Sequence, residues 1–219
     1  MPLDEQETAR TQARYQRIAP FYDAMEILAE RRYAAWRPRL WSLVQGPKVL
    51  EVGVGTGKNI PYYPAGMVVT AIDLTPGMLK RSNARAGDLD ADVNLQLGKV
   101  QDLDFPDNSF DDVVATFVFC SVPDPILGLN EIARVLKSTG RLLLLEHVRS
   151  ANPVLGTLMH ILDPITVRLM GPHINRRTVE NVQRSHLQLE SVEDMGLGGI
   201  FKLIVARIQS TESKLRTRE

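Results

Sequence analysis

The pattern of apolar and polar positions changes in character at Lys48. Before it, two amphipathic stretches predict helices over residues 4–18 and 23–44. The pair Ala19–Pro20 separates them, because a residue before proline avoids the helical conformation. Asp23 is the expected N-cap of the second helix, and Pro38 predicts a kink or a break within it. Residues 1–46 are therefore interpreted as an N-terminal helical cap.

After Lys48, short apolar segments alternate with helical ones. The fourth of these segments contains the run Val113–Val118, which is broken only by Thr116. Strands that are apolar on both faces are typical of a parallel sheet covered by helices on both sides. The expected strands are 48–52, 67–72, 93–97, 111–119 and 141–148, and the expected helices are 76–86 and 124–136.

The end of the chain follows a different pattern. Two strand-like runs, 187–192 and 201–208, are joined by the glycine-rich segment 195–199, which predicts a hairpin. The fold class is thus α/β, a seven-stranded, mostly parallel sheet with a C-terminal antiparallel hairpin and helices on both faces. The main domain spans 47–208, and the polar residues 209–219 are predicted to be a disordered tail.

Residues 151–185, called the lid below, interrupt the pattern between the fifth strand and the hairpin. We expect the lid to cover the carboxyl ends of the strands. It either lies on a bilayer and admits a head group, or is buried against the sheet as ordinary core. Its apolar side chains are Leu155, Leu158, Met159, Ile161, Leu162, Ile165, Val167, Leu169 and Met170.

Composition and charge limit the classes of partner. The 219 residues suit one domain, and 26 basic against 26 acidic residues argue against nucleic acid as a partner. The single cysteine, Cys120, excludes an internal disulfide and a cysteine-based zinc site. No apolar run approaches 18 residues, and the N-terminus lacks the order of a signal peptide. We expect a cytoplasmic chain, with peripheral contact to the inner membrane face as a further expectation.

The local charge of residues 10–40 is less even. Seven arginines stand against three acids, a net charge of +4, and five aromatic residues lie among them. This segment is either a solvated helix face over a packed one, or a basic surface that meets anionic lipid head groups.

A glycine motif carries the first chemical signal. The strand 48–52 runs directly into Gly53, Gly55 and Gly57, which lets the backbone turn sharply and a ligand approach closely. The spacing G-x-G-x-G departs from the G-x-G-x-x-G of dinucleotide sites, although an acid about 20 residues later would also suit NAD. The motif resembles the first motif of class I S-adenosylmethionine methyltransferases. That resemblance implies a Rossmann-like methyltransferase fold with S-adenosylmethionine as cofactor.

The resemblance also implies a set of cofactor-binding residues. Asp73 would accept the ribose hydroxyls, unless it only caps the helix that follows. Asp102 would accept from the adenine amino group, and Phe117 would pack on the adenine. The full predicted set is Tyr15, Glu51, Gly53, Gly55, Gly57, Asp73, Leu74, Met78, Gln101, Asp102, Leu103 and Phe117.

Further segments resemble particular methyltransferases. Residues 15–23 resemble the N-terminal segment of bacterial phosphatidylethanolamine N-methyltransferases and related quinone C-methyltransferases. Segments 145–148, 162–164 and 175–178 resemble the lipid enzymes and also animal thiol methyltransferases. The resemblance implies N-methylation of phosphatidylethanolamine at a membrane surface. Methylation of small thiols or of a quinone precursor, and a non-catalytic cofactor-binding protein, remain alternatives, and the oligomeric state is open.

An amine acceptor must lose a proton before it attacks the methyl group. His147, at the end of the fifth strand, is the predicted base, with a structural role in holding the lid as the alternative. The sulfonium methyl is already activated, so no metal is required, and the histidines lack a zinc-ligand spacing.

The predicted acceptor site contains four further side chains. Tyr22, with Tyr15, would orient a sulfonium or an ammonium through its ring face, unless both only pack in the core. Arg176 and Arg177 would clasp a lipid phosphate, unless they form an exposed helix start. Cys120 would line the methyl-transfer channel as a small apolar residue rather than a nucleophile.

Overall fold

The computed structural model describes residues 5–169, 171–196 and 198–209. The predicted disordered tail 209–219 therefore lies, from residue 210 onward, outside the described residues. The same holds for Met170 of the lid and for Leu197 of the predicted hairpin junction.

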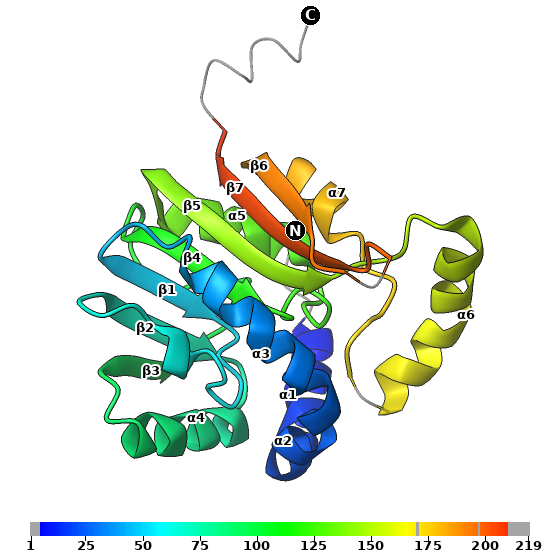
Figure 1. Ribbon diagram of the computed structural model, residues 1–219, viewed down its shortest axis with the longest axis horizontal. Helices are drawn as coiled ribbons and strands as arrows, with labels where there is room; N and C mark the ends of the chain where they lie inside the picture. The colour runs from blue at the N-terminus through cyan, green and yellow to red at the C-terminus, as the bar shows by residue number, and fades with distance from the viewer. Residues whose placement is uncertain (1–4, 170, 197, 210–219) are drawn as a thin grey trace, which may run out of the picture.

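Seven strands form one sheet in the order β3-β2-β1-β4-β5-β7-β6 (Figure 1). Strand β7 pairs antiparallel with both of its neighbours, so it alone runs against the other six. This confirms the predicted fold class. The strands are β1 Lys48–Val52, β2 Val68–Asp73, β3 Val93–Leu97, β4 Phe110–Thr116, β5 Leu136–His147, β6 Leu187–Asp194 and β7 Phe201–Ile208.

Helices cover both faces of the sheet. Alternating strand residues make two cores: Leu50, Val113 and Leu142 face α5 and α7, whereas Val49 and Val114 face α3, with α4 packed beside it. The helices are α1 Glu5–Ile18, α2 Tyr22–Met25, α3 Ile27–Trp41, α4 Pro76–Asp88, α5 Pro125–Val135, α6 Pro153–Leu169 and α7 Thr178–Gln183, with 3-10 turns at Ala19–Phe21 and Ile60–Tyr62.

The cap differs from its prediction in two respects. The expected helix 23–44 is divided at Glu26 into α2 and α3, and α3 continues through Pro38 to Trp41. Burial of Trp41 against the sheet holds that last turn in place. Asp23 does not cap a helix, because its carboxylate accepts hydrogen bonds from Thr56 and Arg81 instead.

Strand β4 ends at Thr116 rather than at the predicted 119. The apolar run continues past the end of the strand, so the sequence pattern does not mark this end. Phe117 begins a turn with a φ of +57°, and Phe119 is fully buried within this turn. Strand β5 begins at Leu136, so Gly140 lies inside this strand and does not close a helix. Asp124 does cap α5, since its Oδ1 accepts from two backbone N–H groups of the first turn.

Helix α6 forms most of the lid and stands clear of the sheet (Figure 1). Met159 and Asp163 on one side of α6 are buried. The opposite side is apolar and exposed, so burial of this helix as ordinary core is wrong. No helix among the described residues is long and apolar enough to cross a membrane. The exposed side chains of α6 are Val154, Leu155, Leu158, Ile161, Leu162 and Ile165.

Candidate cofactor and acceptor site

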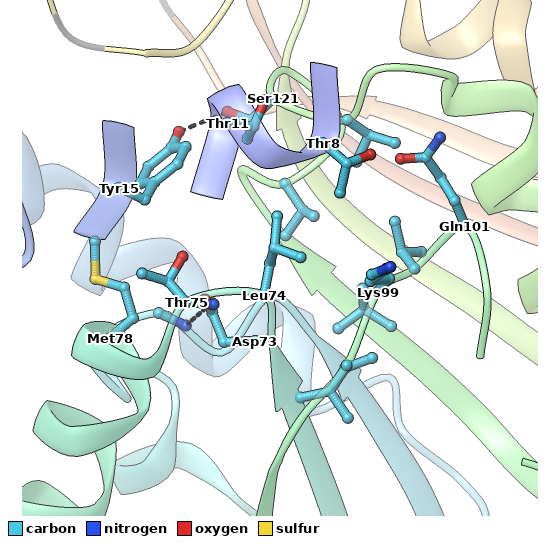
Figure 2. Close-up of a pocket in the computed structure, with 18 of the residues that line it drawn as sticks. Thr8, Thr11, Tyr15, Asp73, Leu74, Thr75, Met78, Lys99, Gln101 and Ser121 are labelled. Carbon is cyan, nitrogen blue, oxygen red and sulfur yellow. Dashed lines mark hydrogen bonds between the residues drawn. The ribbon is translucent and has the colours of Figure 1, made fainter. Parts of the chain in front are cut away.

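A pocket opens at the carboxyl ends of β1, β2, β3 and β4, covered by the N-terminal cap (Figure 2). The strand order reverses between β1 and β4, and ligands of open α/β sheets bind at such a switch point. The lining residues are Thr8, Thr11, Tyr15, Tyr22, Val52, Gly53, Gly55, Ile72, Asp73, Leu74, Thr75, Met78, Gly98, Lys99, Val100, Gln101, Val118, Ser121, Val122 and Pro123.

The glycines of the motif have two different roles. Gly53 and Gly55 line the pocket with φ values of +69° and +58°, where residues with a β-carbon are strained. A β-carbon on Gly53 would lie 2.5 Å from Val118 Cγ2. Gly57 lies outside the lining, and a β-carbon there would meet Ile60 at 2.7 Å. The first two glycines therefore bring backbone close to a ligand, and the third allows close packing.

Asp73 joins two walls of the pocket. Its Oδ2 accepts from the Gly55 N–H at 2.9 Å, and its Oδ1 accepts from the Thr75 N–H at 2.8 Å. Burial raises the pKa of this carboxyl. Each oxygen retains a lone pair that can accept a ribose hydroxyl. Asp73 does not accept from an N–H group of the first turn of α4, so it holds the residue before this helix rather than capping the helix, and it also lies on the pocket wall.

Gln101 lies at the other end of the pocket, near Thr8 (Figure 2). Its side chain is buried, and its Nε2 has no hydrogen-bond partner among the described residues. A buried amide donor without a partner is costly, so an acceptor on a bound ligand would satisfy it. The ring nitrogens of adenine are such acceptors, and the pocket therefore fits S-adenosylmethionine. Asp102 is exposed and outside the lining, which does not favour its predicted contact with the adenine.

The cap supplies one long wall of the pocket. Thr8, Thr11 and Tyr15 follow at spacings of three and four, so α1 presents them on one face. The Tyr15 hydroxyl and Ser121 Oγ share a hydrogen bond of 2.5 Å, and burial raises the pKa of Tyr15. Thr8 and Thr11 were not predicted from the sequence. The helical spacing was the signal for the two threonines.

Ion pairs fasten the cap to the loop after the glycine motif. Lys58 contacts Glu26 at 2.6 Å, and its ammonium lies 5.4 Å from the ring centroid of Tyr22. Asp23 accepts from the Thr56 hydroxyl at 2.6 Å. These partly buried contacts hold Tyr22 in the pocket lining, where the sequence analysis expected it.

Two other predicted cofactor residues lie behind the pocket. Glu51 is buried, accepts from Asn59 at 2.7 Å and from the Tyr63 hydroxyl, and burial raises its pKa to about 6. Leu103 is part of the core. Neither Glu51 nor Leu103 lines the pocket; both are buried behind its wall. Leu74 and Met78 do line it.

Phe117 and His147 belong to an aromatic cluster outside the pocket lining. The Phe117 ring lies 4.5 Å from Tyr33 and 6.5 Å from His147, centroid to centroid. His147 Nε2 lies 2.9 Å from the carbonyl oxygen of His173. A carbonyl only accepts, so Nε2 carries the proton and Nδ1 is the unprotonated nitrogen. Burial lowers the pKa of His147, which keeps it neutral. Its role as the base stays a prediction.

Glu146 holds the turn that follows β4, and the sequence analysis missed it. Its Oε1 accepts from the N–H groups of Val118 and Phe119 at 2.8 and 2.9 Å. Burial raises its pKa to about 8. Cys120 in the same turn is buried, and burial raises the pKa of its thiol, so it remains a small uncharged residue.

Arg176 and Arg177 point to different places. The partly buried Arg176 guanidinium donates to the Val122 carbonyl at 2.9 Å and lines a second cavity beside the cofactor pocket. Arg177 is exposed and lines a separate groove with Arg149 and Lys202. The two arginines thus line different cavities, which does not favour their predicted joint clasp of one phosphate.

Comparisons with known proteins agree with this geometry. The methyltransferase domain family matches residues 50–144. A phosphatidylethanolamine N-methyltransferase of Cereibacter sphaeroides is 38% identical over 162 residues, which cover 73% of this chain and 79% of that protein. A demethylmenaquinone methyltransferase of Renibacterium salmoninarum is 33% identical over 169 residues, which cover 75% and 68%.

The fold has a close counterpart among solved structures. An S-adenosylmethionine-dependent methyltransferase from Thermotoga maritima superimposes with a TM-score of 0.68 at 18% sequence identity, covering 90% of this chain and 99% of that one. The sequence relatives, the strand order and the pocket at its switch point agree with one another. This chain belongs to the S-adenosylmethionine-dependent methyltransferases and is an enzyme of that family.

Proposed function

We propose that this enzyme methylates the amino group of phosphatidylethanolamine at a membrane surface. The observation that carries the proposal is the exposed apolar side of α6, which a protein acting only on small soluble acceptors does not need. The likeness to the phosphatidylethanolamine N-methyltransferase supports the same acceptor.

A second exposed apolar group lies on the cap. Phe21, Met25 and Leu28 are 67%, 48% and 76% exposed, and the exposed Arg31 and Arg32 follow them on α3. The cap and α6 both lie on the side of the sheet where the parallel strands end (Figure 1). Apolar side chains with nearby cations are the features that bind a protein peripherally to anionic lipid.

The chain's residues have a limited chemical task. S-adenosylmethionine supplies the activated methyl group, so the protein mainly aligns the acceptor nitrogen and excludes water. Tyr15 and Tyr22 lie in the lining, where their ring faces attract a cationic sulfonium or ammonium. Their burial raises both pKa values, so both rings stay uncharged.

Release of S-adenosylhomocysteine tests the acceptor directly. We expect release with phosphatidylethanolamine in mixed micelles and none with a small thiol or a demethylated quinone, measured in parallel at equal cofactor concentration. Release with the thiol or the quinone alone would overturn the proposed acceptor and leave the family assignment intact.

Introducing negative charges on the exposed apolar side of α6 tests the membrane contact. We expect the double substitution Ile161→Glu and Ile165→Glu to reduce flotation with anionic vesicles at least tenfold, because two carboxylates would have to enter the interface. Activity towards a lipid acceptor in vesicles falls in parallel, whereas cofactor affinity does not change. Gln188→Glu, at an exposed position on β6 and outside α6, is the control. Equal flotation of the double variant and the wild type would contradict a role for α6.

A further inference from the structure

A second cavity of about 430 Å³ adjoins the cofactor pocket and shares Thr11 and Ser121 with it. It lies between α1 and the segment that follows α6. Two guanidinium groups, Arg14 and Arg176, line it together with the imidazole of His173.

Arg176 lacks the partner that a partly buried cation normally has. Its guanidinium donates only to the backbone carbonyls of Val122 and Cys120, and no carboxylate of the described residues lies within 4 Å. By contrast, Arg37 pairs with Glu30, and Arg134 pairs with Glu131. A guanidinium has five N–H donors, so Arg176 retains donors for a ligand.

Arg14 lines the same cavity and likewise has no carboxylate partner among the described residues. It is partly buried on α1 and has no hydrogen bond or ion pair with any described residue. Two carboxylates also line the cavity. Asp124 is engaged in capping α5, and Glu7 pairs with Arg10 on the surface. Arg14 and Arg176 are thus the cationic side chains of this lining that have no carboxylate partner among the described residues.

We propose that this cavity binds the phosphate ester of the methyl acceptor between Arg14 and Arg176. Planar guanidinium groups match the oxygen pairs of a phosphate. A phosphate bound between the two arginines would supply the negative charge that neither obtains from a protein carboxylate. The shared Ser121 wall would let the ethanolamine nitrogen reach from this site into the cofactor pocket. This inference rests on the proposed function for its acceptor, but the anion site itself can be tested separately.

Calorimetry on the full chain in complex with S-adenosylhomocysteine tests the anion site. The probes are phosphoethanolamine, inorganic phosphate and ethanolamine. We expect both phosphate compounds to bind and ethanolamine not to. Arg14→Gln and Arg176→Gln should each weaken phosphoethanolamine binding at least tenfold. Arg17→Gln, an exposed residue on the same helix and outside the cavity, should change it less than twofold. Arg14→Gln removes no protein contact, so it keeps the test valid if Arg176→Gln fails to fold.

The outcomes separate this proposal from the proposed function. Absence of phosphate binding, or equal binding by wild type and Arg14→Gln, overturns the anion site. If phosphate binding depends on Arg14 but phosphatidylethanolamine releases no S-adenosylhomocysteine, the lipid function fails and the site stands. Methyl transfer to phosphoethanolamine, and not to the lipid, would identify a soluble source of the phosphate. An equal KM for the lipid in wild type and Arg14→Gln would overturn the site while the lipid function holds.

Discussion

Asp73→Ala is expected to lower the affinity for S-adenosylmethionine at least 100-fold. The substitution removes the predicted acceptor of the ribose hydroxyls, and hydrogen bonds to a charged group contribute about 1.5–3 kcal/mol each. It also leaves the N–H groups of Gly55 and Thr75 without their acceptor, so the glycine turn loses its support. Isothermal calorimetry with S-adenosylhomocysteine measures the change.

Two control variants make this result interpretable. Asp92→Ala removes an exposed carboxylate just before β3 and should leave the dissociation constant unchanged. Asp73→Asn keeps the size of the side chain and one oxygen acceptor, and should bind with intermediate affinity. If Asp73→Ala folds with an unchanged dissociation constant, Asp73 has only the structural role of holding its two backbone partners.

The sequence predicted those parts of the site that a local pattern encodes. Gly53, Gly55 and Asp73 follow directly from strand ends, and the structure places all three in the pocket lining. The sequence could not reveal the hydrogen bond between Tyr15 and Ser121, because these residues are 106 positions apart. It also assigned Phe117 to the pocket, although a reversal of the backbone at that residue turns its ring towards Tyr33.

The fold was predictable for a related reason. Apolar strands and the glycine-containing hairpin specify the sheet, and the strand order follows once the family resemblance is recognised. The lid was less predictable, because a segment rich in leucine and isoleucine suits a buried core and a membrane surface equally well. The position of α6, away from the sheet, excludes the buried core (Figure 1).

Glu146 is expected to make the stability of the protein fall as the pH rises from about 5 to 8. The pKa of its carboxyl is raised from 4.5 to about 8 in the folded state, so the favourable contribution is complete below pH 4.5. It is lost as the pH rises through 8, where the folded protein must ionise a buried group. A shift of this size corresponds to roughly 5 kcal/mol at most.

Glu146→Gln should remove this part of the pH dependence. The amide retains an oxygen for the N–H groups of Val118 and Phe119 and has no charge to bury. We therefore expect similar melting temperatures for variant and wild type at pH 5, and a variant more stable by roughly 10 °C at pH 8.5. Glu190→Gln, at an exposed position on β6, is the control and should follow the wild type. Parallel melting curves for Glu146→Gln and wild type across this range would show that Glu146 is ionised in the folded protein. In that case a charged carboxylate, rather than a neutral acid, holds the turn beside the cofactor pocket.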